Sequence, residues 1–124
     1  NWENPIILLL KTITYFNMLK KMEIVIMNND NKEKIEAATF RRLLKHFQEN
    51  PKVQNIDLME LAGFCRNCIS KWYSEESKEN NLEVNYDEAK ELVYGMPYKE
   101  WKEKFQEEQS GDRIDKLSSK FHNH

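Results

Sequence analysis

The sequence predicts an all-α protein, a small multi-helical antiparallel bundle. Apolar residues recur at helical spacing along most of the chain, and no stretch of the body alternates apolar and polar residues as a strand does. Only three glycines and three prolines occur among the 124 residues, too few for the many turns of an all-β fold. A chain of this length supports one domain with a sizeable core, and its short connections suit antiparallel helices.

The first 31 residues differ from the rest and are predicted to be a leader. We expect residues 1–26 to be extraneous upstream sequence with a native start at Met27, the alternative being a flexible segment or an amphipathic helix on the body. The longest apolar run, Ile6 to Leu10, is far shorter than the roughly 20 residues of a membrane span. The acidic start also lacks the basic residues of a signal peptide.

The predicted helical domain covers residues 32–109, and its first helix begins at Lys32. Four apolar residues share one face of this helix at the spacing i, i+3, i+4 and i+7: Phe40, Leu43, Leu44 and Phe47. Asn50 and Pro51 end the helix, because a residue before proline is pushed out of the α region.

The next predicted helix begins near Asp57 and continues to Trp72. Asp57 and Glu60 are predicted to form an N-capping pair. Six apolar residues recur along four turns as a buried stripe: Leu58, Leu61, Ala62, Cys65, Ile69 and Trp72. Gly63 lies inside this predicted helix at a cost of about 1 kcal/mol relative to alanine, and we expect it to admit a closely packed neighbouring helix.

Residues 74–84 are polar and acidic and are predicted to form a loop, with its turn at Asn80–Asn81 and a solvated face at residues 75–79. Asn85 and Glu88 predict the capped start of a third helix. Its expected inner face consists of four residues: Tyr86, Ala89, Leu92 and Val93.

Two residues after this helix mark the next connection. Gly95 predicts a left-handed helix end, and Pro97 predicts the first position of a fourth helix. The buried side of the fourth helix is expected to consist of three aromatic residues: Tyr98, Trp101 and Phe105. Residues 110–124 are predicted to form a short helix and a frayed tail.

Charge is uneven along the chain, although the formal net charge is only −2. Residues 32–73 carry eight basic and five acidic side chains, whereas residues 74–109 carry five basic and eleven acidic ones. We expect the two segments to attract each other within a monomer or between two chains, the alternative being that the acidic segment binds a protein partner. Nucleic acid binding is not expected, because Phe40 and Trp72, the aromatic residues near the basic cluster, lie on predicted core faces.

Cys65 and Cys68 form the one pattern in the sequence that suggests chemistry. Two sulfurs at positions i and i+3 of a helix share a side, so both could ligate one metal ion. His46, on the preceding helix, is the best additional ligand for zinc or iron. Four polar residues could complete such a site or surround it: Asn55, Asp57, Arg66 and Asn67.

Two other roles stay open for the same cysteines. One is packing as small buried thiols, a common role of free cysteine and the one we favour. The other is redox chemistry. The predicted helix places Cys65 about two turns from its N-terminus, beyond the field that activates a thiol, and a disulfide within a regular helix would be strained.

Seven strings along the body have a distinctive combination of residues: Phe40-Arg41-Arg42-Leu43-Leu44 followed by His46, Val53-Gln54-Asn55-Ile56-Asp57-Leu58-Met59, Leu61-Ala62-Gly63-Phe64-Cys65-Arg66-Asn67-Cys68, Lys71-Trp72-Tyr73, Tyr86-Asp87-Glu88-Ala89, Val93-Tyr94-Gly95-Met96-Pro97-Tyr98 and Glu100-Trp101-Lys102. Together they resemble the short bacterial proteins grouped as domain of unknown function 1244, over about residues 32–109. The resemblance implies a small multi-helical fold, a homodimer and a bacterial cytoplasmic location, and it implies no activity.

We therefore expect a non-catalytic binding or interaction module that acts as a homodimer. No Ser-His-Asp set, Gly-rich phosphate loop or pair of perturbed carboxylates is recognisable in the sequence. The alternative is a metal-binding or thiol-dependent protein or enzyme centred on Cys65 and Cys68 with His46. The sequence assigns no catalytic residue, and no cofactor other than the zinc or iron of that alternative.

Overall fold

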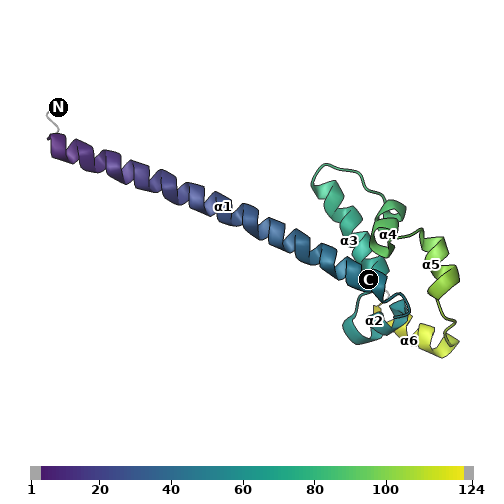
Figure 1. Ribbon diagram of the computed structural model, residues 1–124. Helices are drawn as coiled ribbons and strands as arrows, with labels where there is room; N and C mark the ends of the chain where they lie inside the picture. The colour runs from purple at the N-terminus through teal and green to yellow at the C-terminus, as the bar shows by residue number, and fades with distance from the viewer. Residues whose placement is uncertain (1–3, 122–124) are drawn as a thin grey trace. The chain divides into compact units, whose positions relative to one another are not determined.

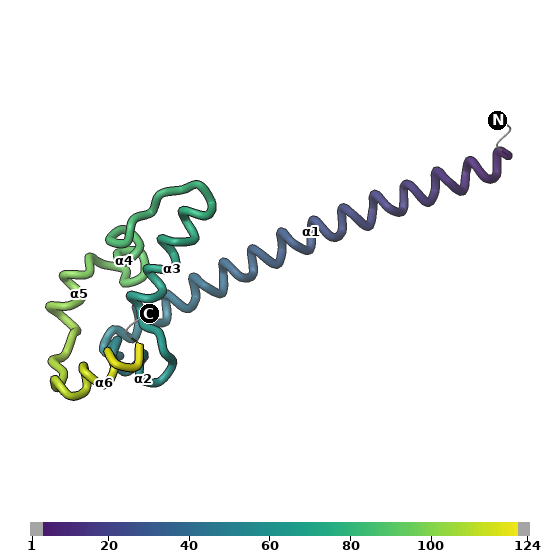
Figure 2. The backbone as a smooth tube through the Cα atoms, turned by 180° about the vertical axis from the view of Figure 1, so that it is seen from behind, coloured from purple at the N-terminus to yellow at the C-terminus, as the bar shows by residue number. Residues whose placement is uncertain are grey.

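The computed structural model describes residues 4–121 and confirms the all-α class. Within these residues it contains six helices and no strand (Figure 1): α1 (Pro5–Glu49), α2 (Asn55–Ala62), α3 (Arg66–Glu79), α4 (Tyr86–Tyr94), α5 (Tyr98–Phe105) and α6 (Gly111–Phe121). The chain divides into two compact units, residues 1–41 and residues 42–124. In the second unit, α3 packs along α4, α4 contacts α5, and α2 contacts α6 (Figure 2).

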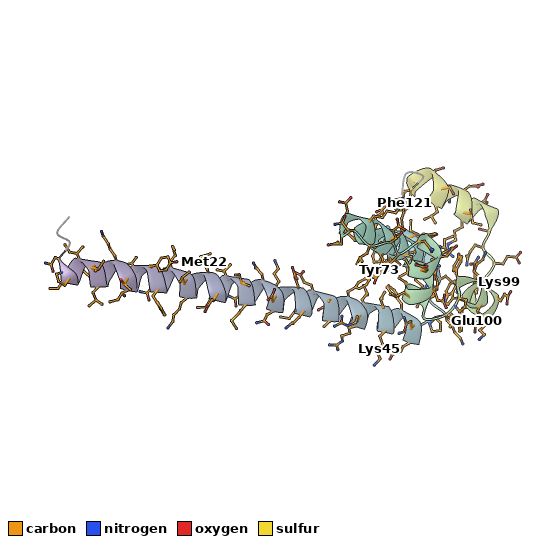
Figure 3. The ribbon with its side chains drawn as sticks, turned by 90° about the horizontal axis from the view of Figure 1, so that it is seen from above. Met22, Lys45, Tyr73, Lys99, Glu100 and Phe121 are labelled. Atoms are coloured by element: carbon orange, nitrogen blue, oxygen red, sulfur yellow. The ribbon has the colours of Figure 1, made fainter. Side chains whose placement is uncertain are left out.

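The first unit is the long N-terminal part of α1. The predicted helix start at Lys32 is wrong, because the helix already begins at Pro5 and continues through the polar residues 28–31. No glycine or proline occurs between residues 6 and 50, so no residue of this stretch interrupts the backbone hydrogen bonds of the helix. Every described side chain of residues 4–39 is exposed, and Figure 3 shows Met22 projecting outward from the helix.

Two other expectations about this region have clear outcomes. The helix ends at Glu49, directly before Asn50 and Pro51, as predicted. None of the helices over residues 4–121 combines the length and the apolar character that crossing a bilayer requires.

The predicted helix from Asp57 to Trp72 is two helices. Gly63 has a φ of 76° and lies just after α2, where its backbone N–H donates to the carbonyl of Met59 at 2.9 Å. This left-handed conformation is the common helix C-terminus that glycine adopts without steric cost. Cys65 is extended, with φ −144° and ψ −175°, and α3 begins at Arg66. The prediction that Gly63 lies inside a helix is therefore wrong.

The predicted capping pair also has a different role. Gln54, not Asp57, precedes α2, and no side-chain hydrogen bond caps this helix. Arg113 of α6 instead donates from Nε to Glu60 at 2.6 Å and forms a second ion pair with Asp57. These two carboxylates therefore tie α6 to α2.

The turn and caps beyond α3 largely match the predictions. Asn80–Asn81 form the turn, and Asn81 has a φ of 60°. Asn85 and Glu88 form a complete capping box at the start of α4. Gly95 ends α4 with a φ of 71°, whereas Pro97 lies one position before α5. The predicted loop at residues 75–79 is wrong, because these residues form the last turns of α3.

The core of the second unit is formed by residues from α1 to α5. Its buried apolar members are Leu44, Phe47, Met59, Cys65, Ile69, Ala89, Val93, Tyr94 and Trp101. Leu61, Trp72 and Leu92, expected on buried faces, are 89%, 43% and 43% exposed. The break at Gly63 explains the exposure of Leu61 and Trp72. The predicted buried face assumed one continuous helix, but the chain changes direction after α2.

Candidate functional site

The start of α3 brings the two cysteines together. Cys65 occupies the N-cap position and Cys68 lies in the first turn, and their Sγ atoms are 3.9 Å apart. No disulfide joins the two cysteines, Cys65 is buried and Cys68 is half-buried. The Sγ of Cys68 also contacts the Sδ of Met59 at 3.8 Å. The structure thus confirms that the sulfurs share a side and corrects their place, which is the beginning of a helix and not its interior.

Burial controls the protonation of Cys65. It raises the pKa of this thiol to about 11, because removing a thiolate from water is costly. The backbone N–H groups of Cys68 and Asn67 act in the opposite direction, since they stabilise the thiolate. Burial has the larger effect, so Cys65 is a protonated thiol at neutral pH.

A metal centre with His46 finds no geometric support in the described chain. Across residues 4–121, no three histidine, cysteine, aspartate or glutamate side chains gather in a group able to hold a metal ion. His46 is exposed near the end of α1, and Asp57 is engaged by Arg113. The metal hypothesis stays a prediction.

Arg66, between the two cysteines, is a buried cation. Its side chain is 1% exposed and donates three hydrogen bonds, to the carbonyl of Val53 at 2.6 Å, Oδ1 of Asn55 at 3.0 Å and the carbonyl of Asn50 at 3.1 Å. The guanidinium carbon lies 5.2 Å from the ring centroid of Phe47 and 5.1 Å from that of Trp101. Within the described residues it forms no ion pair with a carboxylate, so these carbonyls and ring faces stabilise its charge.

A chain of hydrogen bonds continues from Arg66 across four helices, α2, α3, α4 and α5. Asn55 donates to the hydroxyl of Tyr94 at 2.9 Å, and Tyr94 donates to Oδ1 of Asn67 at 2.7 Å. Asn67 donates in turn to the hydroxyl of Tyr98 at 3.4 Å. Burial raises the pKa of Tyr94, so its hydroxyl stays protonated and keeps donating.

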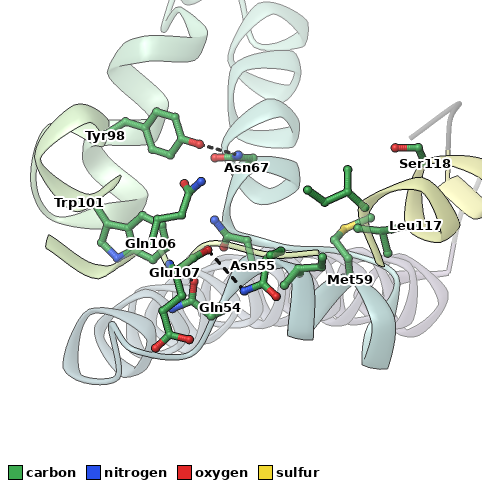
Figure 4. Close-up of a pocket in the computed structure, with 13 residues that line it drawn as sticks. Gln54, Asn55, Met59, Asn67, Tyr98, Trp101, Gln106, Glu107, Leu117 and Ser118 are labelled. Atoms are coloured by element: carbon green, nitrogen blue, oxygen red, sulfur yellow. Dashed lines mark hydrogen bonds between the residues drawn. The ribbon is translucent and has the colours of Figure 1, made fainter. Parts of the chain in front are cut away.

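This hydrogen-bonded chain forms one wall of a pocket of about 270 Å³ (Figure 4). Asn55, Asn67 and Tyr98 are on its polar wall. Five apolar residues from α2, α5 and α6 also line it: Ile56, Met59, Trp101, Ile114 and Leu117. Figure 4 shows Tyr98 and Trp101 on one side of the pocket and Met59 and Leu117 on the other.

The pocket contains binding groups and no recognisable catalytic set. Glu107 is the one charged side chain among the thirteen residues that line it, and the further polar lining residues are Gln54, Gln106, Gln109 and Ser118. No cysteine, histidine or lysine is among those thirteen residues. The arrangement can hold an apolar group and hydrogen-bond to its polar end, which is the usual composition of a ligand pocket.

Sequence reasoning identified part of this site. Asn55, Arg66 and Asn67 were predicted as polar residues around a metal, and the structure brings all three into one hydrogen-bonded network. Tyr94 was not predicted as a site residue, and Tyr98 was predicted only as a core residue. Their spacing in the sequence gives no signal of a shared network, because the tyrosines lie on two different helices and meet asparagines of two others.

The sequence model of a family described as "Protein of unknown function (DUF1244)" matches residues 53–119. The chain belongs to this family. The match confirms the predicted resemblance to DUF1244, beginning after the predicted residue 32 and extending beyond the predicted residue 109. It includes both cysteines, the hydrogen-bonded network and the pocket, whereas His46 lies before it. No curated protein matches the chain.

Proposed function

We propose that this DUF1244 protein is a non-catalytic binding module and that its ligand occupies the pocket between α2, α3, α5 and α6. The composition of the pocket is the observation that carries the proposal: apolar side chains meet a hydrogen-bonded wall of asparagine and tyrosine, with no cysteine, histidine or lysine among the thirteen lining residues. The asparagine side chains are fixed by their partners, so the wall is arranged before a ligand arrives.

The charges at the pocket define the chemical class of the ligand. Glu107 is exposed, and none of the thirteen lining residues is basic. An anion would gain no cationic partner there and would meet the carboxylate of Glu107. The ligand is therefore an uncharged or cationic compound, or side chain, with an apolar body.

We also propose that the protein acts as a homodimer in the bacterial cytoplasm, as the family resemblance implies. Exposed apolar side chains in the second unit support a protein contact, with Leu61 at 89% and Leu82 at 63% exposure. Sedimentation equilibrium of the full chain tests the dimer, with an expected mass of twice the 15.0 kDa of one chain. A mass that stays at one chain over the whole concentration range would refute it.

The ligand proposal is tested with three small compounds that share one ring: phenylacetamide, phenethylamine and phenylacetate. Ligand-observed NMR with the full chain should detect the neutral and the cationic compound at about millimolar affinity, as expected for fragments of this size. Phenylacetate should bind about threefold more weakly, because the exposed carboxylate of Glu107 repels it. Glu107→Gln should remove this difference in affinity.

A matched pair of variants locates the binding. Ile114→Trp adds a large ring to the pocket wall, whereas Leu92→Trp makes a similar change on α4 away from the pocket. The two residues are 47% and 43% exposed, so neither change disturbs the core. Binding should be lost in Ile114→Trp and kept in Leu92→Trp. Equal binding by both variants, or no binding to the unmodified chain, would refute the pocket as the ligand site.

A further inference from the structure

We infer that Cys65 and Cys68 are a thiol–disulfide exchange pair that closes into an intramolecular disulfide with low-molecular-weight disulfides as the oxidant. The inference goes beyond the binding function and does not depend on it. It rests on the geometry at the junction of α2 and α3, which differs from the regular helix that the sequence predicts.

The backbone removes the main obstacle to this disulfide. Two cysteines three apart within a regular helix are poorly placed for a bond, but Cys65 is extended and only Cys68 is helical. Their sulfurs are 3.9 Å apart, whereas a disulfide bond is about 2.0 Å long. Side-chain rotation at the two cysteines can supply the approach, without unwinding α3.

The two residues between the cysteines fix this geometry. Arg66 is anchored to the carbonyls of Asn50 and Val53 on the preceding connection. Asn67 accepts from Tyr94 and donates to Tyr98. Through these hydrogen bonds, both side chains fix the start of α3 to other parts of the fold. The two sulfurs therefore lie close together before an oxidant binds. Such an arrangement raises the effective concentration of one thiol at the other.

Exposure determines which sulfur reacts first. Cys65 is 7% exposed, whereas Cys68 is half-buried and therefore more accessible to a dissolved disulfide. Burial also keeps Cys65 protonated, and only a thiolate is nucleophilic. Cys68 is thus the attacking thiol, and Cys65 is the resolving one.

The exchange proceeds in two balanced steps. Cys68 loses its proton to water, and its thiolate attacks one sulfur of glutathione disulfide and breaks the S–S bond. A mixed disulfide forms, and the glutathione thiolate that leaves takes up a proton from water. Cys65 then loses its proton and attacks the Cys68 sulfur, which closes the protein disulfide and releases the second glutathione thiolate. Two protein thiols are oxidised, and one glutathione disulfide is reduced to two thiols.

The test uses the full reduced chain and glutathione disulfide. Samples are quenched with acid at successive times, the remaining thiols are alkylated with N-ethylmaleimide, and intact mass and peptide maps are recorded. We expect an early adduct of one glutathione on Cys68. A monomeric product should follow that has lost two hydrogen atoms, accepts no N-ethylmaleimide and contains a Cys65–Cys68 link.

Two serine variants separate the roles, with circular dichroism as the check of folding. Cys65→Ser should stop at a stable mixed disulfide on Cys68, and Cys68→Ser should react at least about tenfold more slowly because its remaining thiol is buried. The time course of the unmodified chain decides the matter if either variant fails to fold. A first adduct on Cys65, a persistent mixed disulfide, links between chains, or oxidation only in urea would each overturn the inference.

Discussion

Cys65 is a thiol whose pKa burial raises from an ordinary value near 9 to about 11. The folded state thus holds the thiol proton more tightly than the unfolded state does. The resulting stability is fully present below about pH 9 and is lost as the pH rises towards about 11, by at most about 3 kcal/mol. Urea unfolding of the reduced chain between about pH 8 and about pH 11 measures this loss.

Cys65→Ala is the control for this prediction. Burial also raises the pKa of Tyr94, so some alkaline destabilisation has a second source. The variant keeps that source and lacks the thiol, so its stability should fall less steeply than that of the unmodified chain. Identical slopes for the two proteins would show that Cys65 does not contribute.

Single residues also show where sequence reasoning about the site reaches its limit. Cys65 and Cys68 were identified from their spacing, and their sulfurs do lie 3.9 Å apart at the start of α3. The role of Arg66 was not identified, because its partners are backbone carbonyls and ring faces that no residue pattern records. The structure explains how Arg66 is buried without a carboxylate partner, because it shows where the carbonyl oxygens that accept its hydrogen bonds lie.

At the scale of elements, Gly63 gives the sharpest disagreement between sequence and structure. Replacing a glycine inside a helix by alanine should raise the free energy of unfolding by about 1 kcal/mol. Gly63 has a φ of 76°, however, so replacing it by alanine should instead lower the free energy of unfolding by about 1–2 kcal/mol. The added Cβ would lie 3.5 Å from a ring carbon of Phe121, an ordinary contact, so the loss comes from the backbone.

Urea unfolding of Gly63→Ala therefore decides between the two descriptions by the sign of the change. Gly63→Asn should lose less, since asparagine tolerates the left-handed conformation better than alanine does. Gly111→Ala is the matched control, because its Cβ meets open space in α6 and alanine favours a helix. A stabilised Gly63→Ala would contradict the helix end at this position.

The elements that were predicted well have local signals, and the others do not. Asn85 and Glu88 satisfy each other within four residues, so the start of α4 could be predicted from the sequence. Gly63 is ambiguous, because a glycine can lie within a helix or end it. The choice depends on tertiary contacts, here those of Arg66 with the connection before α2.

At the scale of the whole molecule, composition and the spacing of apolar residues were enough to predict the all-α class, and they were not enough to predict the assembly. The scarcity of glycine and proline and the helical period of the apolar residues both concern one chain. A stripe of apolar side chains looks the same whether it faces its own core or a second copy. The acidic and basic segments have the same ambiguity, so the homodimer is a proposal to be tested in solution.

The native start at Met27 stays a prediction. Because the described side chains before Met27 are exposed, it leads to an expected value for the melting temperature of a chain that begins there. The described side chains before Met27 are all exposed, so a chain beginning there keeps every buried residue of the second unit. Its melting temperature should differ from that of the full chain by less than about 4 °C, or under about 1 kcal/mol for a domain of this size. Circular dichroism melting of both chains provides the comparison.

Phe47→Ala in the shorter chain is the control that shows the measurement can detect a lost core residue. Phe47 is 8% exposed and contacts the guanidinium of Arg66, so its truncation should cost about 3–5 kcal/mol. That loss should lower the melting temperature by more than about 10 °C. A comparable fall on removing residues 1–26 alone would mean that the N-terminal segment stabilises the folded unit, and the proposed start at Met27 would be wrong.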